Sequence, residues 1–226
     1  MGKQLNAQTG SRGRIGNIVY RRWRGMNVAG LRPQSVHNPN TQLQQMARIK
    51  FGYLSQIARA FAAASAIGFM VKYKGTVMGW RNYFSKKNYG LVTLDEYMTP
   101  SIDLTKVSIA EGDVPAPSFR TPSFEGDLEV TSLFGADADI PGTDPTDEVY
   151  LFIYQSDLNQ GILSSAALRS SGTISVKAPE AWSGMTVKVY GFARKVVDYL
   201  DPVAGVILLP KNSTSQTVYL GSGTVE

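Results

Sequence analysis

The spacing of apolar residues changes once along this chain, and that change constrains the fold more than any other feature. From about residue 41 to residue 66, apolar side chains recur every three or four positions, which is the period of an amphipathic helix. From about Ser101 onward, short runs alternate apolar and polar residues between turn residues such as Pro141-Gly and Ser183-Gly. We therefore predict an α+β fold in which helices precede an antiparallel β-sheet region.

Two helices and seven strands are expected. The helices are predicted at 41–66, with Asn40 or Thr41 as N-cap and Gly68 as C-terminal cap, and at 77–87. The strands are predicted at Lys106–Ala110, Asp127–Phe134, Glu148–Gln155, Leu163–Arg169, Thr173–Lys177, Met185–Lys195 and Gln216–Leu220. This number of short strands over about 120 residues is typical of an immunoglobulin-like β-sandwich.

Three divisions of the chain follow from these patterns: a basic arm or β-hairpin at 1–36, a helical segment at 37–94 and the sandwich at 101–226. The cleanly alternating Met185–Lys195 segment should be central in one sheet. An insert at 198–215 contains the apolar run Val206-Ile-Leu-Leu, which predicts either an extra strand or an exposed patch for a partner.

Charge is segregated along the chain. The first 94 residues contain fifteen Lys and Arg residues and no Asp or Glu, whereas all eighteen acids lie from Asp95 onward with the other eight basic residues. A cationic segment can neutralise the phosphates of a nucleic acid, or it can dock on the acidic part of a neighbouring copy. A solvated basic surface without a partner is the third interpretation. We place the partner contact at Arg12, Arg14, Arg21, Arg22, Trp23, Arg24, Arg32, Lys72 and Lys74.

The segment from Gly10 to Val28 is expected to form a basic β-hairpin or an extended arm. Strand-forming residues there alternate with glycines that permit bends. Trp23 lies among three arginines, which suits stacking on nucleic-acid bases or on a guanidinium group. The same side chain would equally serve to anchor the arm to the protein's own core, and both interpretations stay open.

An ordered series of motifs resembles an uncharacterised family, a domain of unknown function that is widespread in Bacteroidota and in mobile elements and phages of that phylum. The motifs are Gly10-Ser-Arg-Gly-Arg-Ile-Gly-Asn-Ile-Val, Arg22-Trp-Arg-Gly-Met-Asn-Val, Asn38-Pro-Asn-Thr-Gln-Leu-Gln-Gln-Met-Ala-Arg, Gly68-Phe, Trp80-Arg-Asn-Tyr-Phe and Ile102-Asp-Leu-Thr-Lys-Val-Ser-Ile-Ala-Glu-Gly-Asp. The resemblance covers most of the chain and implies an N-terminal G-S-x-x-G-x-x-G-N type motif and a C-terminal immunoglobulin-like portion. It implies no activity, because the family has none established.

The residues needed for common catalytic and metal sites are scarce. The chain has no cysteine and one histidine, His37, in a Pro/Asn loop, which argues against zinc and nucleophilic triads. Gly10, Gly13 and Gly16 lack the strand-to-helix context of a phosphate loop. Five acids at Asp137, Asp139, Asp144, Asp147 and Glu148 would suit calcium by type but not by spacing. We expect no enzymatic activity, cofactor, metal or small-molecule substrate.

The N-terminus lacks the apolar core of a signal peptide, and no apolar run approaches the roughly 20 residues of a membrane span. We therefore expect a protein made in the cytoplasm and not bound to a membrane. The preferred function is a non-enzymatic structural protein of a virion or other assembly, of a Bacteroidota phage, whose basic arm docks on nucleic acid or on acidic neighbouring subunits. Its expected partners are further copies of itself or other virion proteins, and nucleic acid. The alternative is a cytoplasmic nucleic-acid-binding protein. A surface adhesion module would need the export signal that is missing here.

Overall fold

A computed structural model of the chain describes residues 12–23, 26–35, 39–73, 76, 78–137, 139–195, 199–200, 207–208 and 213–226. The chain forms two compact units, residues 1–42 and residues 43–226. About 27% of the chain is helix and 36% is strand, which confirms the predicted α+β class.

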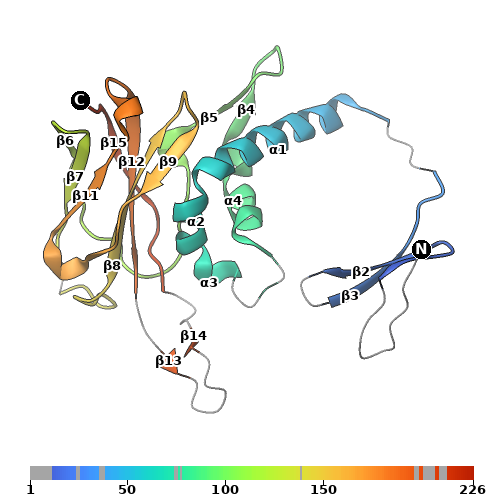
Figure 1. Ribbon diagram of the computed structural model, residues 1–226, viewed down its shortest axis with the longest axis horizontal. Helices are drawn as coiled ribbons and strands as arrows, with labels where there is room; N and C mark the ends of the chain where they lie inside the picture. Colours follow the sequence, from blue (N-terminus) through green and yellow to red (C-terminus); the bar gives the residue numbers. More distant parts are fainter. Residues whose placement is uncertain are drawn as a thin grey trace. The chain divides into compact units, whose positions relative to one another are not determined.

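The N-terminal unit contains an antiparallel sheet of three strands in the order β1-β2-β3. The strands are β1 (Gly13–Ile15), β2 (Ile18–Trp23) and β3 (Met26–Leu31) (Figure 1). A two-residue turn joins β1 to β2, and its Gly16 has a φ of 57°, a conformation that glycine adopts without strain. The expected hairpin is therefore present, and a third strand adds to it.

The second unit begins with helices. These are α1 (Gln42–Ala60), α2 (Ala62–Gly68), α3 (Met70–Tyr73) and α4 (Trp80–Asn88), followed by the 3₁₀ turn η1 (Tyr89–Leu91). The helix predicted at 41–66 is interrupted at Phe61, whose φ and ψ are −85° and 8°. The prediction of Gly68 as a cap was wrong, because it is the last residue of α2 and Phe69 follows as the cap. The predicted second helix begins later than expected, at Trp80.

Two further antiparallel sheets follow, a large sheet of five strands and a small sheet of three. One has the order β10-β8-β12-β15, with β9 also paired to β8, and the other has the order β11-β7-β6. Their strands are β6 (Ser123–Glu125), β7 (Glu129–Leu133), β8 (Glu148–Gln155), β9 (Gln160–Leu163), β10 (Ala167–Leu168), β11 (Thr173–Lys177), β12 (Thr186–Arg194) and β15 (Val218–Thr224). Two small hairpins pair β4 (Val92–Leu94) with β5 (Pro100–Ile102) and β13 (Tyr199–Leu200) with β14 (Ile207–Leu208). Short 3₁₀ turns occur at η2 (Leu104–Lys106), η3 (Arg169–Ser171) and η4 (Glu180–Trp182).

The strand predictions had mixed outcomes. β8 and β11 have the predicted bounds, and β12 lies between β8 and β15, as expected for a central strand. The range predicted as one strand at 163–169 instead holds the end of β9, the short β10 and the start of η3. In the insert, β14 supports the interpretation as a strand, whereas Val206 and Leu209 lie outside the described residues.

The strand predicted at Lys106–Ala110 was wrong. The apolar side chains of this segment are buried, but its backbone N–H groups donate hydrogen bonds to side chains and not to a neighbouring strand. The hydroxyl oxygen of Thr217 accepts from the backbone N–H groups of Ile109 and Ala110 at 2.8 Å each, and Asn88 Oδ1 accepts from the N–H of Ser108 at 2.8 Å. Because these donors are satisfied without a strand partner, the segment stays irregular.

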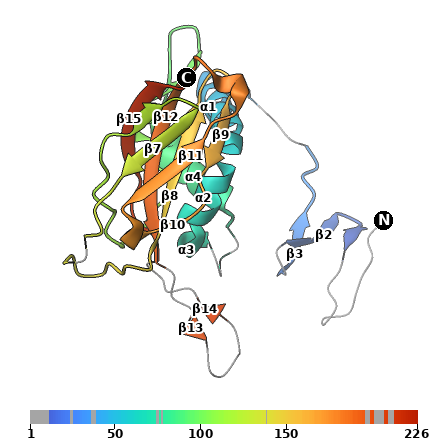
Figure 2. The ribbon, with the colours of Figure 1, turned by 60° about the vertical axis from the view of Figure 1, so that its left-hand side comes forward.

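The central strands β8 and β12 of the large sheet are buried on both faces. Val149, Leu151 and Ile153 of β8 pack in a core with the small sheet, whereas Tyr150, Phe152 and Tyr154 pack in a core with the helices. Figure 2 shows the large sheet between these two layers. The segments predicted as separate helical and sandwich divisions therefore share one core. No described helix is long and apolar enough to cross a membrane.

Candidate functional site

The N-terminal sheet gathers five of the predicted partner-binding arginines. Arg12 precedes β1, Arg14 lies in β1, Arg21 and Arg22 lie in β2, and Arg32 follows β3; all five are exposed. The backbone of Trp23 pairs with Met26, but its side chain is not described. Arg24, Lys74 and His37 lie outside the described residues.

This sheet has no core of its own in the part that the structure describes. None of the residues with a burial assignment in 12–35 is buried. Ile15 pairs with Ile18, and Ile18 pairs with Leu31, so these three residues form a row across one face. Their exposed fractions are 39%, 37% and 80%. An apolar row across all three strands is therefore exposed in the described part of this unit.

Arginines lie on both faces of this sheet, and Arg22 shares the face of the apolar row. The row next to the aliphatic one contains Tyr20 and Ala29, and Arg22 follows on the same face. Arg14 pairs with Val19 and Arg21 pairs with Val28, which places both arginines on the opposite face.

Local contacts hold part of this unit. Arg14 Nε donates to the carbonyl of Gly16 at 2.8 Å, and the N–H of Arg32 donates to the carbonyl of Asn17 at 2.8 Å. Arg21, Arg22, Met26 and Val28 line an open hollow of about 460 Å³. The unit therefore presents cationic and apolar groups side by side.

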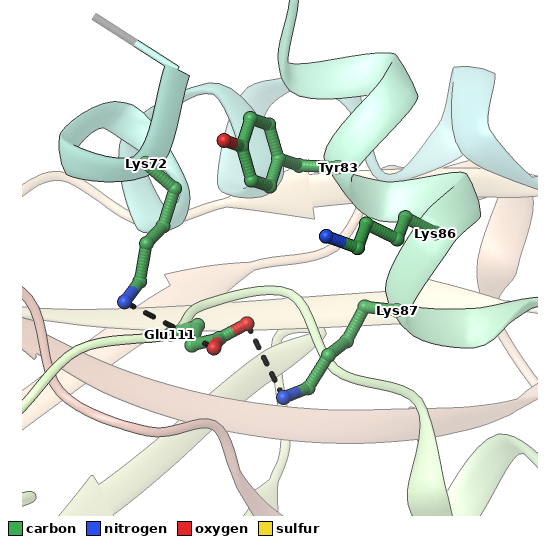
Figure 3. A pocket seen from close by; sticks show the side chains of 5 residues that line it. All are labelled: Lys72, Tyr83, Lys86, Lys87 and Glu111. Atoms are coloured by element: carbon green, nitrogen blue, oxygen red, sulfur yellow. Dashed lines mark ion pairs between the residues drawn. The ribbon is translucent and has the colours of Figure 1, made fainter. Parts of the chain in front are cut away.

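Lys72, the remaining predicted residue, belongs to a different cluster in the second unit. Lys72 Nζ lies 4.0 Å from Glu111 Oε1, and Lys87 Nζ lies 3.2 Å from Glu111 Oε2 (Figure 3). A hollow of about 230 Å³ lies here, and it is lined by Lys72, Tyr83, Lys86, Lys87 and Glu111. Part of the basic helical segment is thus neutralised within the chain, by an acid that sequence analysis did not single out.

The position of Glu111 depends on close packing at Gly68. A Cβ atom at Gly68 would lie 2.3 Å from the carbonyl oxygen of Ile109 and 2.6 Å from the Cβ of Ala110. The N–H of Glu111 donates to the carbonyl of Gly68 at 3.2 Å. The glycine therefore allows the segment before Glu111 to approach α2, which carries the carboxylate to the lysines of α3 and α4.

Two acidic residues between β7 and β8, Asp137 and Asp147, face a buried arginine. The side chain of Arg169 is 0% exposed, with Nε 3.3 Å from Asp147 Oδ2 and Nη1 3.9 Å from Asp137 Oδ2. Arg169 Nη2 also donates to the carbonyl of Pro115 at 2.6 Å. Burial raises the pKa of Asp147, although the neighbouring guanidinium acts in the opposite direction. Among the described residues, no group of three or more candidate ligands is placed to hold a metal ion.

Glu111 lies in the Ile102–Asp113 motif, but nothing in the sequence marked Glu111 or Arg169 as a partner of particular charged residues. Each acts through partners from separate elements, and their spacing along the chain matches no motif. Only folding brings these charges together.

No curated protein and no solved structure matches this chain. Residues 10–199 match a family profile described as "Family of unknown function". This range includes β1 to β3, the helices, and the large sheet except β15. Because the match spans most of the sequence, the chain belongs to the DUF6266 family.

Proposed function

We propose that this chain is a non-enzymatic structural protein of a virion or other large assembly, and that its N-terminal sheet docks on a neighbouring copy. The observation that carries the proposal is the exposed row of Ile15, Ile18 and Leu31. A three-stranded sheet needs a buried apolar face or a packing partner for stability. A second protein surface would supply that partner.

Charge complementarity favours a second copy as this partner. Residues 1–42 contain seven Lys and Arg residues and no acid, whereas 101–226 contains sixteen acids and eight basic residues. Opposite potentials steer association and suppress wrong pairings. The basic sheet of one copy would dock on an acidic surface of the next.

A nucleic acid is the alternative partner. The arginines would suit phosphates, and Tyr20 would suit a base. The exposed aliphatic row favours protein instead, because phosphate contacts make no use of Ile15, Ile18 and Leu31. The phage setting comes from the resemblance of the motifs to a family found in Bacteroidota phages.

We further infer that the large sheet and the small sheet of the second unit form an immunoglobulin-like sandwich. In that fold, strands A, B and E share one sheet and strands C, F and G share the other. The orders β6-β7-β11 and β8-β12-β15 follow this arrangement and support the inference. The helices would then cover the outer face of the second sheet.

The test is the mass of the full-length protein by size-exclusion chromatography with light scattering, at low and high salt and after nuclease treatment. We expect the wild-type protein to form a multimer whose mass is unchanged by nuclease. Leu31→Ser, which removes the most exposed member of the row, should lower the measured mass. Leu168→Ser is the matched control, because Leu168 is 52% exposed in β10 of the other unit. It should leave the mass unchanged.

Two outcomes would contradict self-assembly. A monomer at low salt would exclude it. A small species that copurifies with nucleic acid, and loses it steeply as salt rises, would favour the nucleic-acid alternative. In that case Arg21→Gln should weaken binding and Leu31→Ser should not.

A further inference from the structure

Three lysines in the second unit surround a single carboxylate, which leaves positive charge without a partner. Lys72 and Lys87 both pair with Glu111, whereas Lys86 forms no ion pair with any described residue. Figure 3 shows the side chain of Lys86 extending into the hollow between Tyr83 and Lys87. With one carboxylate facing three ammonium groups, the hollow carries an excess of two positive charges.

We propose that this hollow, formed by Lys72, Tyr83, Lys86 and Lys87, binds a phosphate group. The proposal is independent of the N-terminal sheet and of the assembly it is proposed to form. A phosphate dianion would balance the two excess charges, whereas a single carboxylate would leave one of them.

The donors of the hollow also match phosphate. Each lysine ammonium supplies three N–H donors and binds phosphate as a point charge. The hydroxyl of Tyr83 makes no hydrogen bond with a described residue, and it offers a further donor. The volume of about 230 Å³ accommodates a small anion.

Glu111 has two opposing effects in this site. It holds Lys72 and Lys87 at the mouth of the hollow, at 4.0 Å and 3.2 Å, so less side-chain freedom is lost on binding. It also competes with the ligand, since its carboxylate pairs with two of the same ammonium groups. The 4.0 Å contact to Lys72 is long, which leaves that ammonium the more available of the two.

The test follows inorganic phosphate binding to the full-length protein by phosphorus NMR at an ionic strength of about 0.15 M, where the Debye length is about 8 Å and charges outside the hollow are largely screened. Lys86→Gln is expected to weaken binding by about two- to fivefold, the range of an exposed ion pair. Arg81→Gln is the matched control, because it removes one exposed positive charge from the same helix α4 outside the hollow. It should change binding by less than about 1.5-fold.

Glu111→Gln provides a test in the opposite direction. Removing the competing carboxylate should tighten phosphate binding, because the ion pairs at 4.0 Å and 3.2 Å join partly exposed groups and position the lysines only weakly. A variant that merely damaged the fold would not bind phosphate more tightly. Unchanged or weaker binding by this variant would count against the proposal.

A second arm of the experiment distinguishes free phosphate from the phosphate groups of a nucleic acid, using a short DNA duplex as the probe. A loss specific to Lys86→Gln with the duplex, but no binding of inorganic phosphate, would assign the site to a nucleic-acid backbone. If Lys86→Gln and Arg81→Gln lose equal affinity for both probes, the proposal is overturned. The probes would then respond only to the net positive charge of the helix and not to the hollow.

Discussion

Phe61 lies at the centre of the core between the helices and the large sheet. It is 0% exposed, and its ring centroid lies 5.6 Å from Phe84, 5.0 Å from Phe152, 4.6 Å from Tyr154 and 5.8 Å from Tyr190. Truncation would leave a cavity that aromatic neighbours from both layers cannot fill. We expect Phe61→Ala to lower the free energy of unfolding by about 3–5 kcal/mol, measured by urea denaturation.

Phe51→Ala is the control for this substitution. Phe51 lies in α1 and is 57% exposed, so its truncation should change the free energy of unfolding by about 0.5 kcal/mol or less. Similar losses in both variants would contradict the central position of Phe61. Helical periodicity predicts an apolar face for the helix that contains Phe61, but the four aromatic contacts of Phe61 come from other elements of the chain.

At the scale of elements, the contact between α2 and the segment around Ile109 requires a glycine. Gly68→Ala would place a methyl group against the backbone of Ile109 and the side chain of Ala110. We expect a loss of about 1–3 kcal/mol in the free energy of unfolding, measured by urea denaturation. The same change should displace Glu111, whose backbone N–H donates a hydrogen bond to the carbonyl of Gly68.

Gly52→Ala provides a control of opposite sign. Gly52 lies inside α1, and an added Cβ would have no neighbour within 4 Å. Because alanine restricts the unfolded chain and favours the helix, this variant should gain about 0.5–1 kcal/mol. A loss of stability in Gly52→Ala would show that the effect at Gly68 is not one of close packing alone.

At the scale of the whole molecule, the two units differ in their capacity to fold alone. The second unit contains both hydrophobic cores, whereas the described residues of the first bury none of their side chains. A variant lacking residues 1–38 keeps Asn40 and Thr41 before α1. It should unfold cooperatively within about 3 °C of the full chain when both are monomeric, measured by calorimetry. Loss of the cooperative transition would contradict the independence of the second unit.

Much of this architecture could be predicted from local patterns. The change from helical to alternating periodicity is a property of neighbouring residues, and it located the helices and the strands β8, β11 and β12. The segregation of charge is likewise visible without a fold, and it directed attention to the arginines of the N-terminal sheet. The irregular segment at 107–110 escaped this reasoning because Thr217 and Asn88 satisfy its backbone from distant elements.

The amino-acid sequence by itself determined the α+β class, the central strands and the basic N-terminal segment, because each depends on the order of nearby residues. Only the tertiary structure decided that the helices cover one face of the large sheet, that Gly68 serves close packing, and that Glu111 lies among three lysines. The physical reason is the same in each case. These contacts join residues that are distant along the chain, and burial and electrostatic attraction select them only after the elements have formed.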